Sequence, residues 1–188
     1  MFGINKTSLG IFLVCISLMA TQVAIAATQG IMSITFDIER IGGIANNQYA
    51  VWLEDSSGHY IKTLSVTRFA ANGGFNKRPD TLPLWVKVSD WANNVQTDVD
   101  AVSTATPGTG IVTLQWDGKD SQGQVVPAGE YIYKIEGNIS GPKRILWTGR
   151  IIIGQGPNSS IASAEYIPDK ETATQKGLFI TNIKVSYR

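Results

Sequence analysis

Cysteine and histidine are nearly absent from this chain of 188 residues. It has one cysteine, Cys15, and one histidine, His59. Cys15 falls in an N-terminal segment that we expect to be removed, so the rest of the chain cannot form a disulfide, a thiolate metal site or a cysteine nucleophile. Because His59 stands alone in a predicted hairpin turn, neither a histidine metal cluster nor a Ser-His-Asp triad can be assembled around it. These two shortages exclude most hydrolases and metalloenzymes.

The sequence also lacks an excess of charge of one sign. Lys and Arg number 16, Asp and Glu number 15, and the formal net charge is +1. Nucleic-acid binding needs clustered Lys and Arg, and no such block is present, so we expect no nucleic-acid partner. Beyond the N-terminal segment, no apolar run approaches the ~20 residues of a membrane-spanning helix. We therefore expect no insertion into a membrane.

The start of the chain has the pattern of an export signal. Lys6 precedes the apolar run at 9–20, which is followed by the small-residue motif A-I-A at 24–26. This pattern is typical of a secretory signal peptide that is cut after Ala26. We expect residues 1–26 to be the signal peptide, and residues 27–188 to form a single β-sandwich domain that is periplasmic or secreted.

At least seven segments have the composition of β-strands. Ile34, Phe36 and Ile38 alternate with polar residues, which is the period-two pattern of a half-buried strand. The predicted strands are 33–38, 49–54, 60–67, 111–116, 131–136, 144–153 and 178–187. Gly, Pro, Asn and Ser separate them, and residues 55–59 predict a hairpin turn. This pattern predicts an all-β fold, an antiparallel immunoglobulin-like β-sandwich, with a closed barrel as the alternative.

One segment breaks the strand period. Its apolar residues recur at helical spacing: Leu84, Trp85, Val88, Trp91 and Val95. Pro83 suits a first helical position, so we predict one short helix from about Pro83 to Asn94, lying against an edge or end of the sheets. Residues 154–177 are polar and predict a long surface loop with a short strand at 161–167.

Residues 114–135, LQWDGKDSQGQVVPAGEYIYKI, form a hairpin module. They resemble the immunoglobulin-like domain of flagellar hook-capping proteins, whose pattern is W-D-G-x-D-x-x-G-x-x-V-P-x-G-x-Y. Asp117 and Asp120 hint at a calcium loop, but Lys119 occupies the place of the second acidic ligand and no bidentate Glu follows. We interpret both aspartates as turn formers. The module indicates a fold rather than an activity.

A wider resemblance runs from about Tyr49 to Gly137. In order, the parts are YAVWLEDSSGHYIKTL, a Trp-containing helix, DAVSTATPGTG and the WDGKD hairpin. This succession is similar to a family of bacterial periplasmic proteins built on domain of unknown function 2271. In that family the loop before the hairpin typically reads D-A-x-[ST]-G-A-T.

That loop motif resembles the acceptor sequence of covalently flavinylated proteins, in which an exported transferase takes FMN from FAD and joins its phosphate to the final threonine hydroxyl. The resemblance makes Asp100 the motif aspartate and Ser103 the hydroxyl residue. It makes Ala105 the alanine and Thr106 the acceptor. Thr104 stands where the motif has glycine, and its β-branched side chain makes positive φ costly. The resemblance implies a covalent FMN carrier for electron transfer, with a flavin transferase and a redox protein as partners.

Other interpretations of these residues stay open. The Thr106 loop can be an ordinary polar connection, and the protein is then a cofactor-free immunoglobulin-like interaction or assembly module. Asp98 and Asp100 could hold a cation, assist proton removal from Thr106 or, least favoured, act as paired carboxylates in hydrolysis, although solvated loop carboxylates are the preferred interpretation. A stacking surface for the flavin ring could come from Trp52, Trp85, Trp91, Trp116 or Trp147, with Trp85 or Trp91 as the expected contact, although large aromatics mostly serve the core. We expect no catalytic residues and no enzyme activity of the protein by itself.

Overall fold

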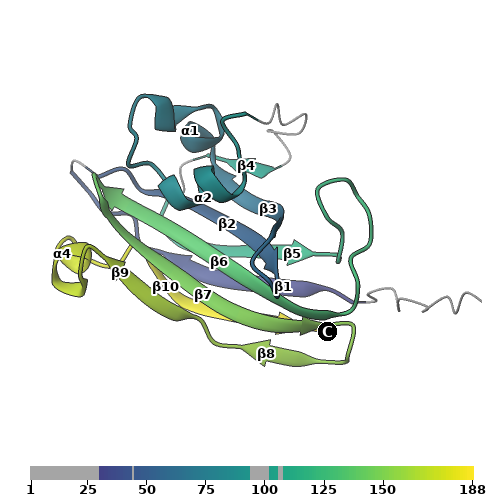
Figure 1. Ribbon diagram of the computed structural model, residues 1–188. Coiled ribbons are helices and arrows are strands. Elements are labelled where there is room, and N and C mark those ends of the chain that lie inside the picture. The colour runs from purple at the N-terminus through teal and green to yellow at the C-terminus, as the bar shows by residue number, and fades with distance from the viewer. Residues whose placement is uncertain (1–29, 44, 94–101, 106–107) are drawn as a thin grey trace, which may run out of the picture.

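The computed structural model describes residues 30–43, 45–93, 102–105 and 108–188 (Figure 1). The predicted signal peptide lies outside these residues. The strands are β1 (Met32–Ile38), β2 (Gln48–Asp55), β3 (Tyr60–Thr67), β4 (Ser103–Thr104), β5 (Gly110–Trp116), β6 (Gly129–Ser140), β7 (Lys143–Ile153), β8 (Asn158–Ser160), β9 (Ser163–Ile167) and β10 (Ile180–Tyr187). The helices are α1 (Arg68–Ala71), the 3-10 helix η1 (Gly74–Asn76), α2 (Pro83–Val88) and α4 (Lys170–Thr174).

The strands form two sheets. One has the order β5-β1-β10-β8, and the other has the order β4-β3-β2-β6-β7-β9. Neighbouring strands are antiparallel, apart from β3 and β4, which pair in parallel through Val66 with Ser103 and Thr67 with Thr104. Figure 1 shows the two sheets as separate layers. The predicted all-β sandwich is confirmed, and two sheets replace the alternative of a closed barrel.

The main core fills the space between the two sheets. Met32, Ile34, Phe36 and Ile38 of β1 are buried, as the alternating pattern predicts. They pack with inward side chains of β2, β6, β7 and β10, and the Phe36 ring lies edge-on to Tyr49 with ring centroids 5.6 Å apart. Burial of apolar surface stabilises a fold by about 25 cal/mol per Å², so this core can hold the sandwich without disulfides.

A second apolar cluster covers the outer face of the six-stranded sheet. Figure 1 shows α1 and α2 lying over β2 and β3 on this face. The buried members of the cluster are Ala50, Trp52, Val66, Ala70, Ala71, Leu82, Trp85, Trp91 and Leu146. Because both faces of β2 are covered, its burial is continuous from Gln48 to Glu54 and does not alternate.

The predicted helix is too long. The helix α2 begins at Pro83, as predicted, but it ends at Val88 and does not continue to Asn94. The chain then turns, because Asp90 takes a left-handed φ of 49°. Trp91 still packs on Trp85 after the turn, which explains why the apolar residues keep a helix-like spacing.

The structure also has helices and strands that the sequence patterns did not predict. The described residues hold three short α-helices, not one, and α1 and α4 span only four and five residues. Segments of one turn carry no measurable hydrophobic period. The expected surface loop at 154–177 contains β8, β9 and α4, and the short strand predicted within it corresponds to β9.

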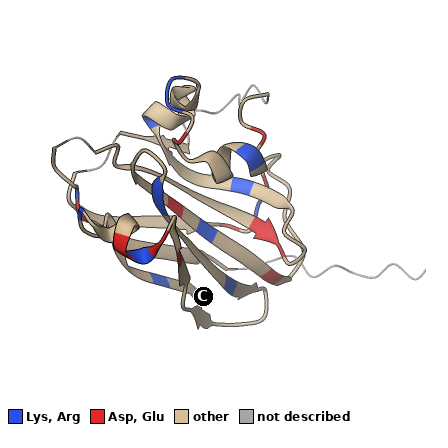
Figure 2. Cartoon of the chain, turned by 60° about the vertical axis from the view of Figure 1, so that its left-hand side comes forward, with Lys and Arg blue, Asp and Glu red and all other residues tan. Residues whose placement is uncertain are grey.

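Charged side chains of both signs are interspersed along the six-stranded sheet (Figure 2). They pair across neighbouring strands: Lys134 with Glu54, Arg144 with Glu136, and Arg150 with Glu130. Positive and negative charges therefore balance on this sheet, as they do over the whole sequence.

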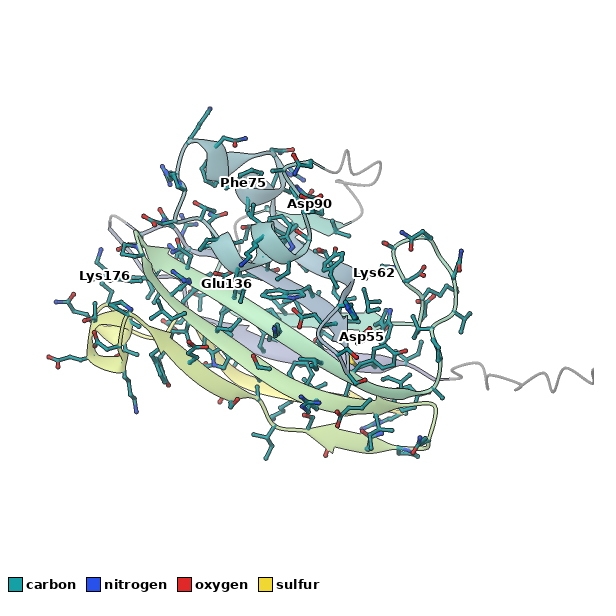
Figure 3. All side chains as sticks on the ribbon, in the orientation of Figure 1. Asp55, Lys62, Phe75, Asp90, Glu136 and Lys176 are labelled. Carbon is teal, nitrogen blue, oxygen red and sulfur yellow. The ribbon has the colours of Figure 1, made fainter. Side chains whose placement is uncertain are left out.

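A buried carboxylate joins α2 to this sheet. Glu136 of β6, labelled in Figure 3, is fully buried, and its Oε2 accepts a hydrogen bond of 2.9 Å from the backbone N–H of Trp85. Its Oε1 lies 3.3 Å from Nε of Arg144. Burial raises the pKa of Glu136, and the hydrogen bonds and the Arg144 charge oppose this only in part. Glu136 thus fixes the start of α2 over the sheet.

We expect Glu136→Gln to destabilise the protein less than Glu136→Ala. The amide keeps an acceptor for the Trp85 N–H, whereas alanine leaves this N–H and Arg144 unpaired, a loss of about 2–4 kcal/mol. Because the folded-state pKa is raised, the carboxyl favours folding fully below the unfolded value of ~4.3. This contribution is lost as the pH rises through the folded pKa.

Urea unfolding of the wild type and of Glu136→Gln at several pH values measures this effect. The unfolding free energy of the wild type minus that of the variant should fall as the pH rises from about 4 towards neutrality. A difference that stays constant over this range would contradict a raised pKa at Glu136.

Candidate functional site

A pocket of about 370 Å³ opens at the edge of the sandwich, between β3 of one sheet and β5 of the other. This edge pocket is lined chiefly by Tyr60, Lys62, Leu64, Val102, Gln115 and Trp116. Its volume lies in the range of small-molecule sites, ~300–1,000 Å³. It is therefore large enough for a small organic ligand.

The edge pocket exists because the outer edge of β3 is only partly covered. The strand β4 pairs with Val66 and Thr67 alone, so among the described residues the first half of β3 has no strand partner on that side. The β2–β3 register shifts twice, between Val51 and Trp52 and between Leu53 and Glu54. Bulges of this kind re-aim side chains at sheet edges. They place the bulged half of β3 along the pocket wall.

Tyr60 gives the edge pocket aromatic surface, whereas Trp116 is 2% exposed and packs edge-on to Tyr131 in the main core. The Tyr60 hydroxyl lies 2.7 Å from Oγ1 of Thr63, and burial raises the pKa of Tyr60, so the phenol is neutral at physiological pH. Nε1 of Trp116 donates a 2.7 Å hydrogen bond to the carbonyl of Lys119. Each ring is thus held in a fixed orientation at its polar end.

Lys62 brings a positive charge to the edge pocket. Its Nζ donates a 3.3 Å hydrogen bond to the carbonyl of Asp120, and Figure 3 shows Lys62 on the side of the sheet from which the 117–128 hairpin projects. Hydrogen bonding from the Lys119 side chain, and then the positive charges of Lys119 and Lys62, hold the pKa of Asp117 below its ordinary value. The Asp117 carboxyl is therefore ionised at neutral pH and lies in the same pocket as the Lys62 side chain.

The 117–128 hairpin is built by turn-forming side chains, as predicted. Oδ1 of Asp120 accepts hydrogen bonds from the backbone N–H groups of Gln122 and Gln124. Gly118 and Gly123 take left-handed φ values of 76° and 78°. Within the described ranges, no group of three or more His, Cys, Asp or Glu could hold a metal ion.

The flavinylation-like loop is described on both sides of the expected acceptor. Thr106 and Asp100, together with Asp98, lie outside the described residues. Ala105 before the acceptor and Gly108 after it are both exposed. The loop leads from β4 in the six-stranded sheet to β5 in the four-stranded sheet. The nearest described residue on each side of Thr106 is therefore open to solvent.

Thr104 takes extended backbone where the motif has glycine. It forms β4 with Ser103, and its Oγ1 lies 3.1 Å from the hydroxyl of the buried Tyr49. A β-branched residue suits an extended conformation, so this position has no need of a positive φ. Beside it, Oγ of Ser103 is buried and has no hydrogen-bond partner in the described part of the chain. Such an orphaned polar atom requires an explanation.

We expect Thr104→Gly to lower stability without raising flavin uptake. The variant loses the hydrogen bond to Tyr49 and gains backbone freedom, a cost of about 1–2 kcal/mol. Thermal unfolding measures the loss, and intact mass after co-expression with a flavin transferase measures uptake. Thr104→Ser, which keeps the hydroxyl, is the matched control and should stay near the wild type. Higher occupancy in the glycine variant would show that the loop needs the motif conformation.

The two tryptophans expected to contact a flavin ring lie in the second core. Trp85 is 0% exposed and Trp91 is 5% exposed, and their ring centroids are 4.7 Å apart. Nε1 of Trp85 donates to Thr63, and Nε1 of Trp91 donates to the carbonyl of Ala71. The preferred assignment of large aromatics to the core is confirmed for this pair.

Of the aromatic residues that line the edge pocket, Tyr60 was not identified from the sequence, and Trp116 was named only among the five tryptophans that could stack on a flavin ring. Tyr60 is the first residue of β3 and Trp116 is the last residue of β5. Both positions are strand ends beside polar turns, which is the local signal that could have singled them out. Their meeting in one pocket depends on the pairing of the two sheets.

Comparison with known proteins gives a family match. A family model described as "Predicted periplasmic protein (DUF2271)" matches residues 32–180, which include the six-stranded sheet and the strands β1, β5 and β8 of the other sheet. No curated protein and no solved structure matches the chain. None of the described helices has the length and apolar character needed to cross a membrane.

Proposed function

This chain belongs to the DUF2271 family of predicted periplasmic proteins, and from that premise we propose that it is an exported carrier of covalently bound FMN that serves electron transfer. A flavin transferase joins the FMN phosphate to the hydroxyl of Thr106: the pyrophosphate bond of FAD breaks as the phosphate ester forms, AMP leaves and the threonine hydroxyl gives up its proton. The observation that carries the proposal is the D-A-V-S-T-A-T loop, whose described flanks Ala105 and Gly108 are exposed. A modifying enzyme needs such access to its acceptor.

The residues around the loop suit this group. The buried Oγ of Ser103 is without a partner in the described part of the chain and stands three positions before Thr106. It can donate a hydrogen bond to a phosphate or ribityl oxygen. FMN supplies reversible uptake of electrons when it is bound. Among the described residues of the motif, Ser103 is thus the one whose hydroxyl lacks a hydrogen-bond partner.

The rest of the chain acts as a scaffold for the loop. The strand β4 anchors the loop by pairing with β3 and by the contact of Thr104 with Tyr49. The carrier presents its cofactor to a redox partner protein and is not an enzyme by itself. The intact mass of protein exported alongside an active flavin transferase tests the proposal, with an increase of one FMN moiety as the expected result.

A cofactor-free interaction module is the second candidate function. The 117–128 hairpin projects from the sandwich (Figure 1), and its Val125 is 49% exposed. Binding residues are often carried on loops that a rigid scaffold presents, and in this function the hairpin is the contact for another protein. Pull-down from an envelope extract discriminates between the functions. A partner that Thr106→Ala retains supports the module, whereas loss of every partner together with the flavin contradicts it.

A further inference from the structure

We propose that the edge pocket binds the planar tricyclic ring of the flavin, an inference that rests on the proposed function for the identity of its ligand. The pocket measures about 370 Å³ and opens to solvent between the two sheets. All of the residues that line it are described. The proposal therefore assigns a role to side chains that the flavinylation motif does not include.

The walls of the edge pocket suit a flat aromatic ligand. Tyr60 contributes a partly exposed ring from β3, whereas Trp116 of β5 lines the pocket with an almost fully buried ring. Leu64 and Val102 add apolar surface between these strands. Aromatic rings bind other planar rings through offset or edge-on contacts, and small-molecule pockets are mostly apolar with a few placed polar groups. Hydrogen bonds at Thr63 and Lys119 hold the two rings before a ligand arrives.

The polar groups of the pocket complement one side of a flavin ring. The ring carries two carbonyls and an N–H, and the amide of Gln115 can both donate and accept hydrogen bonds. Lys62 has three N–H donors, of which one serves the carbonyl of Asp120. A cation near the ring stabilises the negative charge that reduction adds. Asp117 does not cancel this effect fully, because its Oδ2 lies 2.7 Å from Nζ of Lys119.

The edge pocket lies within reach of the acceptor loop. Val102 lines the pocket and stands four residues before Thr106. Four residues of extended chain span at most about 14 Å between Cα atoms. A phosphate and a five-carbon ribityl chain connect the acceptor oxygen to the ring. The tether therefore allows a ring attached through Thr106 to enter a pocket that begins at Val102.

Lumiflavin, which is the flavin ring without the ribityl phosphate, tests the pocket separately from the covalent bond. The exported Thr106→Ala protein should bind lumiflavin saturably, measured by quenching of lumiflavin fluorescence. In this background Gln115→Trp should weaken binding at least tenfold, because the new ring fills the pocket. Thr113→Trp is the matched control: it lies two positions earlier on the same exposed face of β5, does not line the pocket and should bind like the parent.

A second pair of variants covers the case in which Gln115→Trp fails to fold. Ser121 lines the pocket from the exposed hairpin, whereas its neighbour Gln122 does not. Ser121→Trp should weaken lumiflavin binding, and Gln122→Trp should not. Absence of saturable binding, or equal binding in the filled and control variants, would overturn the proposal.

The results also separate this proposal from the carrier function. Covalent FMN on the wild type without lumiflavin binding to Thr106→Ala leaves the carrier standing and overturns the ring site. Lumiflavin binding that the filled variants lose, without any covalent FMN on the wild type, supports the pocket and overturns the carrier.

Discussion

Replacing Thr106 by alanine should abolish the FMN-sized mass increase that the wild-type protein gains when it is exported alongside an active flavin transferase. A phosphate ester requires a hydroxyl on the acceptor, and alanine has none. The effect is therefore a complete loss and not a graded one. Intact-mass spectrometry of both proteins, purified from the same strain at equal expression, measures it.

Thr109→Ala is the matched control for this experiment. Thr109 is exposed in the same loop, and its Oγ1 accepts a 3.1 Å hydrogen bond from the backbone N–H of Arg40. Its loss should cost about 1 kcal/mol of stability and leave the FMN increment intact. An FMN increment on the Thr106→Ala protein would show that another residue is the acceptor. Loss of the increment in both variants would point to a disturbed loop and would not support Thr106 as the acceptor.

Trp85→Ala should have the largest effect on stability. Trp85 is fully buried, packs on Trp91 and donates a 3.0 Å hydrogen bond to Thr63. Truncation leaves a large cavity and removes one of the two hydrogen bonds at the Thr63 hydroxyl, for an expected loss of about 3–5 kcal/mol. In a domain of this size the melting temperature should fall by roughly 6–20 °C. Thermal unfolding followed by circular dichroism measures the shift.

Leu84→Ala is the control for the second core. Leu84 neighbours Trp85 on the same helix but is only partly buried, so its truncation should lower the melting temperature by less than half as much. If Trp85→Ala lowers the melting temperature no more than Leu84→Ala does, α2 contributes little to the stability of the fold. The second cluster would then be a loosely held cover over the sheet.

The sandwich could be predicted because its evidence is local. Alternation in β1 and the Gly and Asp turns of the 117–128 hairpin are properties of neighbouring residues, and the structure places both as expected. The continuous burial of β2 depends on a helix layer over its second face, which no strand pattern reports. The helical spacing of apolar residues also continues past the end of α2 at Val88. It does so because Trp91, which follows a turn, still packs on Trp85.

Only one part of the candidate site could be predicted from the sequence. The acceptor motif is a run of adjacent residues and can be recognised from the sequence. The edge pocket is assembled from β3, β5 and Val102, and its shape comes from two bulges and from a strand, β4, that covers only the end of β3. Lys62 and Gln115 are ordinary strand residues in the sequence. They become site residues only when the register of both sheets is known.

The most direct test of the carrier is the tryptic peptide 88–119, which follows Lys87, ends at Lys119 and contains the whole acceptor loop. It should be isolated by reversed-phase chromatography from protein exported alongside an active flavin transferase. The flavin absorbance should elute with this peptide, and fragmentation should place one FMN moiety on Thr106. An unmodified peptide, with the flavin absent or eluting elsewhere, would contradict the account.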